Sequence, residues 1–460
     1  MNQERIKDFC KRMFDISLFD YQLDFLMDCF HHKRILGCWS RQIGKSTTVA
    51  IFACLYAILN DNVTVIIVAS ADRQSKEIYR KLLGFCHRVK EFKETIHRET
   101  QDETTFTNGS RILCLPVGDD GSYIRGYTAD VLIEDEACFI SDEINDEVLE
   151  PFLATKLEGK LIKISTPRGK VGHFYRSFLN QAYRVHHYDY TFGVDNGLID
   201  QEFIDGKRVE MDSLSFAAEY GAEFVEEASS YFPSDMVNSA ITDYNPYSEV
   251  SEIPKGEYYL GVDPSRLGLD AATFIVVQRG EEEHKVVFVK EIAKSTLDKQ
   301  GDYILKLHSQ FNFRRIYLDE TGLGAGLGDY LALKLNPSRK LAGSDLKGTG
   351  KVLGDDIVVG ITFTNQAKKD IYSNLRTLLE NNELLIPKNP QLIAEMKDLM
   401  YEYTDNGVLK IFHPPNKHDD YTDALALACK ELSLHVAPLT FGRLESTFMP
   451  TGMLLKDMMR

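Results

Sequence analysis

Residues suited to phosphate chemistry occur first in the stretch "WSRQIGKSTT" (39–48). Gly44, Lys45 and Ser46 complete the end of the phosphate-loop pattern G-x-x-x-x-G-K-[ST], but Trp39 stands where the first glycine belongs. Backbone N–H groups at the start of the following helix would receive phosphates, because the helix dipole favours negative charge there. Lys45 would reach the β- and γ-phosphates and Ser46 would bind Mg²⁺. The stretch therefore predicts an ATP site.

Two later strand ends supply the other parts of such a site. The apolar run "VLIEDEA" ends in Asp135, which would assist Mg²⁺, and Glu136, which would polarise the attacking water. The next strand, "LIKISTP", ends in Ser165 and Thr166, where a polar side chain can sense the γ-phosphate. Upstream of the loop, Gln22 could hydrogen-bond the adenine edge or could equally be a helix-surface residue.

Two arginines are rivals for stabilising the charge of a transferred phosphoryl group. Arg41 lies inside the loop and is nearer to the phosphates in sequence. Arg125 precedes the "VLIEDEA" strand and is better placed to reach a neighbouring subunit. Either residue could also be an ordinary surface cation.

The second group of chemically suited residues is a set of carboxylates in the last 200 or so residues of the chain. They end predicted strands or begin the last predicted helix: Asp263, Asp270, Asp319, Asp419, Asp420 and Asp423. Asp423 can share a helix face with either Asp419 or Asp420. Converging carboxylates repel one another unless cations neutralise them, and oxygen ligands favour Mg²⁺ or Mn²⁺. Two such ions about 4 Å apart could clamp a phosphodiester for hydrolysis.

Hydrophobic periodicity predicts the elements that must position these residues. Strands at 34–40, 63–70, 111–117, 130–137 and 161–167 alternate with helices at 47–59 and 73–89, which indicates a mainly parallel sheet. The later pattern is a strand–turn–strand over 257–280, a strand, glycine-rich loop and helix over 314–331, and a helix over 417–432. The order of the acids is that of ribonuclease H-like nucleases.

The fold class is therefore α/β with two domains. We expect a P-loop ATPase of the RecA-like (ASCE) type at 1–215, with a helical part at 1–36, and a connector at 216–254. We expect an RNase H-like nuclease with a mixed sheet at 255–435 and a C-terminal tail at 436–460.

Composition limits the classes of function. The chain has 460 residues, 43% of them hydrophobic and 27% charged, as in globular proteins. Its 8 cysteines form no C-x-x-C pair, which argues against a zinc ribbon and a disulfide framework. We expect no signal peptide and no membrane span. The net charge of −16 argues against static, high-affinity coating of nucleic acid but allows an enzyme with a local basic track.

The motifs together resemble the large terminase subunit of tailed bacteriophages, and the resemblance spans nearly the whole chain. "SRQIGKS" is similar to that family's atypical phosphate loop, which also lacks the first glycine. "LIEDEA" resembles its Walker B motif and "STP" its coupling motif. "VDPS", "YLDETG" and "HDDYTDALALA" resemble its nuclease motifs.

The resemblance implies roles for individual residues. Residues for binding ATP would be Gln22, Ser40, Arg41, Gln42, Gly44, Lys45, Ser46, Thr47 and Asp135, with Glu136 catalytic and Arg125 an arginine finger acting in trans. Ser165 and Thr166 would couple hydrolysis to movement. Asp263, Asp319 and Asp420 would be the core metal ligands, with Asp270, Asp419 and Asp423 as helpers.

The resemblance also implies partners and a place of action. The chain would use ATP and Mg²⁺ (or Mn²⁺ at the nuclease site), move double-stranded DNA and cut concatemers. It would form a ring on the portal protein at the procapsid vertex and work with a small terminase subunit. It would be a monomer in free solution in the host cytoplasm and be absent from the mature virion.

Two other interpretations stay open. A helicase or repair ATPase fused to a nuclease would need a second RecA-like set, for which residues 200–250 are too few. An assembly protein with an inactive nuclease would not need the complete acid set.

Overall fold

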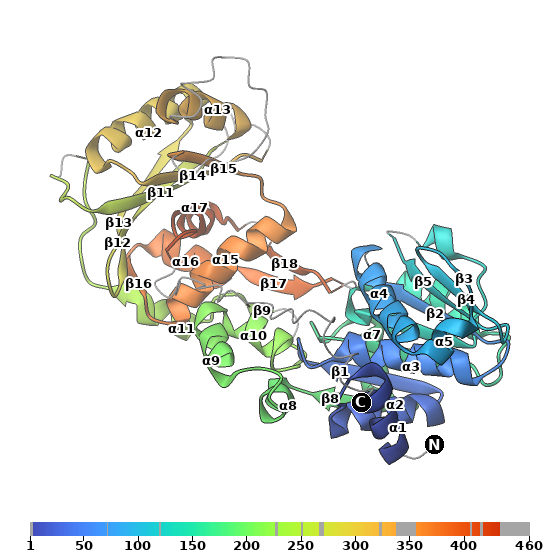
Figure 1. Cartoon of the computed structure of the whole chain (residues 1–460). Helices are drawn as coiled ribbons and strands as arrows, with labels where there is room; N and C mark the ends of the chain where they lie inside the picture. The colour runs from blue at the N-terminus through green and yellow to red at the C-terminus, as the bar shows by residue number, and fades with distance from the viewer. Residues whose placement is uncertain are drawn as a thin grey trace, which may run out of the picture.

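The computed structural model has two lobes joined by a helical region (Figure 1). It describes residues 3–70, 72–118, 121–225, 229–249, 252–265, 271–321, 324–336, 356–404, 407–414 and 417–432. Each helix in this part of the chain is too short or too polar to span a lipid bilayer. The predicted tail at 436–460 and Asp270 lie outside the described residues.

The first lobe is built on an eight-stranded sheet in the order β3-β4-β5-β2-β6-β7-β1-β8. Its parallel part comprises β5 (Arg111–Pro116), β2 (Thr64–Ala69), β6 (Val131–Asp135), β7 (Lys160–Ser165), β1 (Arg34–Trp39) and β8 (Arg184–Tyr188). β3 (Ile96–Glu99) and β4 (Glu103–Phe106) add an antiparallel edge. Since β1, β6 and β7 are neighbours and parallel, their carboxyl ends meet at one edge of the sheet.

Apolar helices cover this sheet. α3 (Lys45–Leu59) packs between α2 (Asp20–His31) and α4 (Asp72–Arg88), and its buried face joins the main core of the lobe. α1 (Gln3–Phe9) and α5 (Lys90–Thr95) lie at the outside of this group (Figure 1). A second core on the other side of the sheet includes Leu132, Leu149 and Phe152. The strands between these layers are buried on both faces, as expected for parallel strands.

The second lobe has a seven-stranded mixed sheet in the order β10-β16-β13-β12-β11-β14-β15. Antiparallel pairs join β11 (Glu257–Asp263), β12 (Ala271–Arg279) and β13 (His284–Ala293). Parallel pairs join β11 to β14 (Arg315–Asp319) and β14 to β15 (Val358–Ile361). β16 (Leu384–Pro387) and β10 (Ile241–Thr242) extend the far edge.

Helices cover both faces of this second sheet. α12 (Leu297–Phe311) and α13 (Gly324–Leu335) form one core, and α15 (Asn365–Glu380), α16 (Pro390–Asp398) and α17 (Asp420–Ala428) form the other. A small antiparallel sheet of β9 (Ser229–Ser230), β17 (Met400–Tyr403) and β18 (Leu409–Phe412) points toward the first lobe (Figure 1).

The segment between the sheets is helical. α7 (Gly172–Leu179) precedes β8, and α8 (Tyr190–Asp195), α9 (Gln201–Glu210), α10 (Ser213–Glu219) and α11 (Ser234–Ala240) follow it. Leu214 and Ala218 of α10 pack into the core of the second lobe. The α/β class is confirmed, with a mainly parallel first sheet and a mixed second sheet. The predicted last helix begins at Asp420 and not at Lys417.

Candidate active sites

The predicted phosphate loop lies between β1 and α3, at the carboxyl edge of the first sheet. Gly44 has φ +93, a conformation that L side chains rarely adopt, and it precedes the first residue of α3, Lys45. The Lys45 ammonium donates to the carbonyl oxygens of Trp39 (3.1 Å) and Ser40 (3.2 Å), which brings it back over its own loop. Burial lowers the pKa of Lys45, against the raising effect of Glu136 and Asp135. Ser46 and Thr47 occupy the first turn of α3, where phosphates would be received.

Gln22 and Tyr21 of α2 support this loop. The Gln22 side-chain amide donates to the Ile43 carbonyl (3.0 Å), and its oxygen accepts from the Phe19 N–H (3.2 Å). The Tyr21 hydroxyl also donates to the Ile43 carbonyl (2.7 Å). A Cβ added at Gly44 would lie 2.3 Å from Gln22 Nε2, so another residue would be strained by the positive φ and would displace the Gln22 amide. The structure thus places Gln22 against the loop itself, while adenine contact stays a prediction.

Trp39, which replaces the first glycine of the pattern, belongs to the core of the first lobe. It is 1% exposed, and its ring packs edge-on against Phe25 (5.1 Å between centroids), Tyr21 (5.5 Å) and Tyr188 (5.1 Å). The loop is therefore anchored by an aromatic cluster where other phosphate loops begin with a glycine turn.

The acids predicted to act with Mg²⁺ and water lie at the adjacent strand end. Asp135 is 4% exposed, and its Oδ1 has no hydrogen-bond partner within the described part of the chain. Burial, and next the charge of Glu136, raises the pKa of Asp135 to about 7. Glu136 has φ +50, a strained left-handed conformation of the kind that concentrates at functional sites. Ser165 Oγ donates to Glu136 Oε2 (3.0 Å), which links the predicted coupling residue to the predicted base, and Thr166 is buried beside it.

This arrangement fits a nucleoside triphosphate with a divalent cation. The loop offers a helix N-terminus and a lysine, while Asp135 offers a buried carboxylate oxygen that nothing in the described chain satisfies. A cation bound beside Asp135 would satisfy that oxygen and would lower the cost of its burial.

Arg41 and the loop that follows β7, at residues 166–169, meet at one carboxylate that the sequence did not single out, Glu219. The Arg41 guanidinium binds both Glu219 oxygens, and the Arg41 N–H donates to the Glu219 carbonyl (2.9 Å). Arg168, directly after "STP", donates to Glu219 Oε1 (2.5 Å) and lies over the Phe139 ring. Burial acts to raise the pKa of Glu219, but the two guanidinium groups outweigh it and hold that pKa below its ordinary value.

The two remaining loop residues predicted to contact ATP differ in exposure. Ser40 is fully buried, and its N–H donates to the Tyr188 carbonyl (2.8 Å). Gln42 is exposed and has φ +63, so its side chain is free of the packing that fixes Ser40.

Arg125 lies on the surface of the first domain. It follows the short helix Ser122–Ile124, and its side chain is 57% exposed. Its recorded ion pair is a long one with Glu147 (3.5 Å). Within its own chain, therefore, Arg125 is a surface group and Arg41 is the arginine of the loop.

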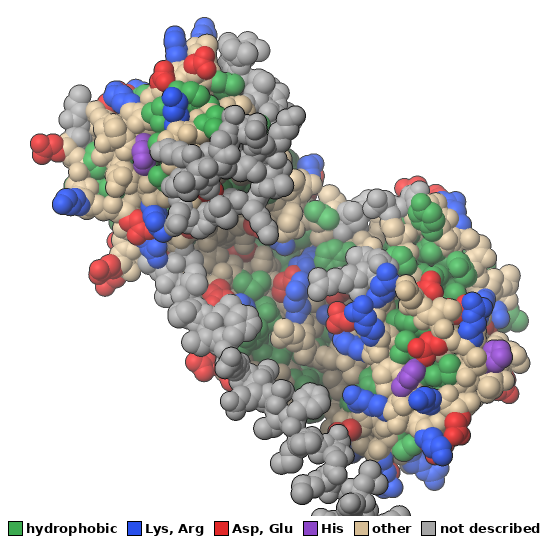
Figure 2. Space-filling view, turned by 45° about the horizontal axis from the view of Figure 1, so that its top comes forward, with side chains coloured by type: hydrophobic (Ala, Val, Ile, Leu, Met, Phe, Trp, Pro, Cys, Tyr) green, Lys and Arg blue, Asp and Glu red, His purple; other side chains and the backbone are tan. Residues whose placement is uncertain are grey.

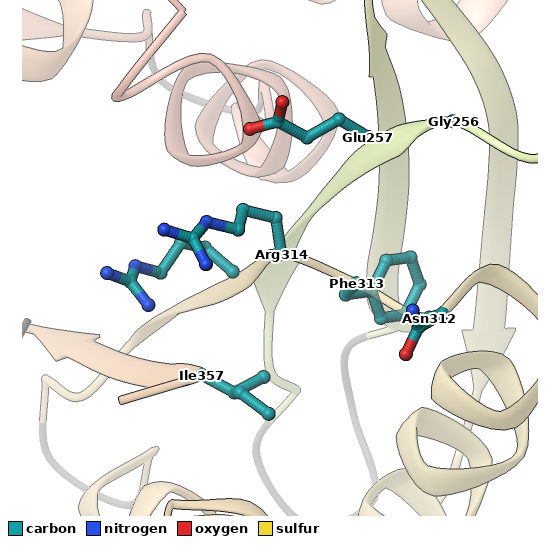
Figure 3. A pocket seen from close by; sticks show the side chains of 7 residues that line it. Gly256, Glu257, Asn312, Phe313, Arg314 and Ile357 are labelled. Carbon is teal, nitrogen blue, oxygen red and sulfur yellow. The ribbon is translucent and has the colours of Figure 1, made fainter. Parts of the chain in front are cut away.

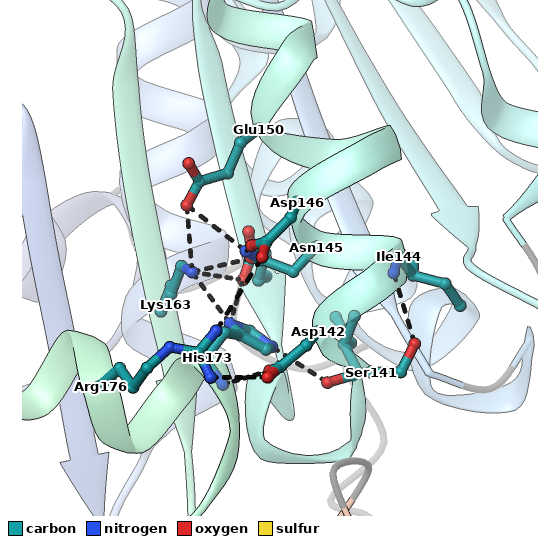
Figure 4. Close-up of polar contacts among 11 residues, drawn as sticks. Ser141, Asp142, Ile144, Asn145, Asp146, Glu150, Lys163, His173 and Arg176 are labelled. Atoms are coloured by element: carbon teal, nitrogen blue, oxygen red, sulfur yellow. Dashed lines mark hydrogen bonds and ion pairs between the residues drawn. The ribbon is translucent and has the colours of Figure 1, made fainter.

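A buried polar network adjoins β6, the strand that ends in Asp135 (Figure 4). Lys163 of β7 donates to Asn145 Oδ1 (2.8 Å) and contacts His173 Nδ1 (2.9 Å). It also pairs with Glu134 of β6 at 3.6 Å, too long to satisfy the Glu134 oxygens, which are fully buried. Burial raises the pKa of Glu134 to about 7 and lowers that of His173 to about 3. The network ties β6 and β7 to the helical segment that follows Ser141.

The second candidate site begins at two neighbouring strand ends. β11 and β14 are parallel with Val262 opposite Leu318, so Asp263 and Asp319, one residue on, end side by side. α17 approaches β11 so closely that a Cβ at Gly261 would lie 1.9 Å from the Ala424 carbonyl oxygen. This contact brings the acids at the start of α17 to the same edge of the second sheet.

A lysine that the sequence analysis missed holds two of these acids. Lys368 Nζ, from α15, lies 2.7 Å from Asp419 Oδ2 and 3.4 Å from Asp423 Oδ2. The hydroxyl of Tyr372, one turn further along α15, donates to Asp423 Oδ1. Asp419 and Asp423 therefore share the helix face turned toward α15.

The acids influence one another strongly. Burial, followed by the charges of Asp423, Asp420, Asp319 and Asp419, raises the pKa of Asp263 well above its ordinary value. Among the described residues, however, no three acidic, histidine or cysteine side chains form a ready-made metal site. Asp319 Oδ1 accepts from the N–H (2.8 Å) and hydroxyl (2.5 Å) of Thr321. The available donors are carboxylate oxygens, and the negative charge of each carboxylate disfavours ionisation of its neighbours. Such a set of oxygen donors fits hard divalent cations.

Two pockets lie on this domain. One of about 260 Å³ adjoins the acids and is lined by Asp420 together with Glu291, Glu395 and His418. Another of about 650 Å³ lies at the opposite, amino-terminal end of β11, where Figure 3 shows Glu257 and Arg314. Of these two pockets, the smaller one is lined by a predicted site residue, Asp420.

The comparisons with known proteins agree with each other. The family described as "Terminase large subunit, T4likevirus-type, N-terminal" matches residues 36–239. The large terminase subunits of Thermus phage G20c and Thermus virus P23-45 are each 22% identical to the chain over 445 residues, with 86% of the chain and 84% of each relative covered. The large terminase of a thermophilic bacteriophage, solved in complex with ADP, has a TM-score of 0.56 at 13% identity, covering 90% of this chain and 99% of that chain.

Proposed function

We propose that the chain is a large terminase subunit whose first domain hydrolyses ATP to move double-stranded DNA and whose second domain cuts concatemeric DNA. The observation that carries this is the meeting of Lys45, Asp135, Glu136 and Ser165 at one edge of the first sheet, with a separate acid cluster in the second domain. We assign the ATPase to 1–215, the connector to 216–254 and the nuclease to 255–435.

In the first domain, Lys45, Ser46 and the loop N–H groups bind the phosphates. Glu136 orients the attacking water and accepts its proton, and Ser165 fixes the carboxylate of Glu136 by its hydrogen bond. Gln22 positions the loop, and Ser165 and Thr166 pass the state of the γ-phosphate to the rest of the domain. Mg²⁺ held by Ser46 and Asp135 would neutralise phosphate charge here, and divalent ions held by the acids of the second domain would supply the charge that activates water and stabilises the leaving oxygen.

The two arginines take different roles. Arg41 contacts the phosphates of its own chain, because it lies in the loop. Arg125 reaches the site of a neighbouring copy, because its side chain is exposed on the surface. This division requires a ring of copies.

In the second domain, Asp263, Asp319 and Asp420 hold the metal ions. Asp419 and Asp423 shape the centre through Lys368, and Asp420 faces the adjoining pocket. Asp270, which lies outside the described residues, is proposed as a further helper from its position in the sequence.

We also propose the partners of the motor. Copies of the chain form a ring on the portal protein at the procapsid vertex, with the small terminase subunit selecting the DNA. The free chain is a monomer in the host cytoplasm and leaves before the virion matures. On the face shown in Figure 2, basic side chains of the first domain are mixed with acidic ones. With a net charge of −16, this fits weak DNA binding by the isolated chain.

The test is a packaging assay with purified procapsids, ATP and linear double-stranded DNA. We expect DNase-protected DNA with the wild type and none with Glu136→Gln, while Glu143→Gln, a nearby substitution outside the site, packages normally. Strand separation without protected DNA would contradict the proposal and would favour a helicase.

A further inference from the structure

We propose that Thr273 of β12 is a positioning residue of the nuclease centre, and that its hydroxyl donates to the Asp263 carboxylate when the centre holds its cations. The inference rests on the proposed function and adds a residue that none of the sequence motifs contains.

Thr273 places a hydroxyl where the strand is otherwise apolar. The residue is 0% exposed, and its neighbours Ala272, Phe274 and Ile275 are equally buried. Its Oγ1 has no hydrogen-bond partner in the described part of the chain. A buried hydroxyl without a partner destabilises the fold, whereas valine has nearly the same shape and no polar group to satisfy. This cost indicates that the hydroxyl finds its partner in another state of the protein.

The alternation of side chains places Thr273 on the face of the second sheet that α17 covers. Ile275, two positions along β12, belongs to the core that α17 helps to form. Ala272 and Phe274 belong to the core on the other face, with α12 and α13. Because successive side chains of a strand point to opposite faces, Thr273 shares the face of Ile275.

Asp263 lies on the same face, directly opposite Thr273. β11 and β12 are antiparallel, and their register pairs these two residues. Gly261, two positions before Asp263, faces the Ala424 carbonyl of α17, which puts Asp263 on the side of α17 as well. Side chains directly opposite each other in such a pair have Cβ atoms about 5 Å apart. The Thr273 hydroxyl is therefore within reach of the Asp263 carboxylate.

The third strand and the last helix enclose the hydroxyl. The register of β12 and β13 places Glu291 on the other side of Thr273, and Glu291 accepts from the Tyr421 hydroxyl (2.7 Å) of α17. The pocket lined by Glu291 and Asp420 also reaches Ala271, two positions before Thr273 on the same face. Thr273 thus lies beneath the helix that carries Asp420, between two acid-bearing strands.

Of the two acids beside Thr273, Asp263 is the one suited to accept from it. Glu291 is exposed and already accepts from Tyr421. Among the described residues, no hydrogen bond to the Asp263 carboxylate is present. A carboxylate that binds a cation through one oxygen can accept through the other, and such a hydrogen bond fixes the orientation of the ligand. The bond between Thr273 and Asp263 would therefore form as the cations bind.

The experiment compares full-length wild type, Thr273→Val, Thr273→Ser and Thr377→Val. Paramagnetic resonance measures Mn²⁺ affinity, and the binding that is lost in Asp263→Ala is that of the nuclease centre. We expect Thr273→Val to bind Mn²⁺ about tenfold more weakly and to cleave plasmid more slowly, because a metal ligand loses its hydrogen-bond partner. Thr273→Ser keeps the hydroxyl and should restore most of the affinity. Thr377→Val, a buried threonine bonded to the Ser373 carbonyl, should bind Mn²⁺ as the wild type does.

The melting temperature gives a second readout, which includes the metal-free chain. Thr273→Val removes a hydroxyl that has no partner there, so without divalent cations the variant should melt at or above the wild-type temperature. Mn²⁺ should then raise the melting temperature less in the variant than in the wild type, because a ligand stabilises the folded chain according to its affinity. A hydroxyl with only a structural role would lower the metal-free melting temperature when removed.

The outcomes separate this inference from the proposed function. If the wild type neither binds Mn²⁺ through Asp263 nor cuts DNA, the nuclease assignment and this inference both fail. If the wild type does both and Thr273→Val keeps the wild-type Mn²⁺ affinity, this inference alone fails. It also fails alone if Thr273→Val melts below the wild type without metal, because the hydroxyl would then have its partner in the metal-free chain.

Discussion

The two proposed catalytic regions are built on different principles. The phosphate loop is one contiguous segment whose backbone makes most of the site, and its lysine is already held by loop carbonyls. The nuclease centre draws carboxylates from two strands and a helix, and within the described chain a lysine, Lys368, pairs with two of them. Backbone donors do not repel one another, so the phosphate loop can form before its ligand arrives. Carboxylates do repel, so the second site needs cations to assemble.

The largest expected effect tests whether the two regions act separately. Lys45→Ala should lower ATP hydrolysis by about 10²-fold or more, because a half-buried cation facing the phosphates is lost. Plasmid cleavage without nucleotide should stay within about twofold, because distant sites behave independently. Phosphate release and gel assays measure the two rates. Lys388→Ala, a surface lysine paired with Asp243, is the control, and parallel loss of both activities in Lys45→Ala would contradict the separation.

Within the ATP site, the base should matter more than the residue that orients it. Glu136→Gln should lower hydrolysis by about 10²-fold, as expected for loss of a general base. Ser165→Ala should lower it only about fivefold, because one hydrogen bond contributes about 1 kcal/mol. Binding of a fluorescent nucleotide should be unchanged in both variants. A larger effect of Ser165→Ala than of Glu136→Gln would reverse the assignment.

At the nuclease centre, removing the resident lysine should favour cations. Lys368→Met should bind Mn²⁺ at least about fivefold more tightly, because the ammonium that competes with the cation for Asp419 and Asp423 is removed. The variant should nevertheless cleave DNA more slowly, because Lys368 no longer holds these two carboxylates in position. Titration of Mn²⁺ by paramagnetic resonance measures the affinity, and Lys368→Arg, which keeps the charge, should resemble the wild type more closely. Unchanged Mn²⁺ affinity in Lys368→Met would contradict a role for Lys368 in the centre.

The smallest expected effect concerns the network behind Asp135. Burial raises the pKa of Glu134 from 4.5 to about 7, so the folded chain holds this proton more tightly than the unfolded chain. The free energy of unfolding should therefore fall as pH rises from 4.5 to about 7. Above that range it should stay at its lower value. At each pH, the melting temperature of the wild type is subtracted from that of Glu134→Gln. This difference should be larger at pH 8 than at pH 5 by about 2 °C or more. A difference that does not vary with pH would show that Glu134 is ionised throughout.

Most of the fold was predictable because its signals are local. The strands at 34–40, 130–137 and 161–167 are short apolar runs with polar ends, and the structure has β1, β6 and β7 there. The glycine, lysine and acids at their ends are adjacent in sequence, so each motif carries its own geometry. Trp39 was ambiguous because only packing against Phe25 and Tyr188 shows that it is a core residue.

What could not be predicted depends on contacts between distant segments. Glu219 lies 178 positions from Arg41, and "FAAEYGAEF" gives no sign that its first acid binds two arginines. Lys368 lies 51 positions before Asp419 in an ordinary amphipathic helix. Arg168 was the exception, since it directly follows "STP" and could have been noted as part of that motif.

The most direct test of the account is cleavage of plasmid DNA by the purified chain with Mg²⁺ or Mn²⁺, comparing wild type, Asp263→Ala and the surface control Asp243→Ala. We predict metal-dependent cutting by the wild type and by Asp243→Ala, and none by Asp263→Ala, with ATP hydrolysis intact in all three. Equal cutting by wild type and Asp263→Ala, or no cutting by any of them, would contradict the assignment of the second domain as a metal-dependent nuclease.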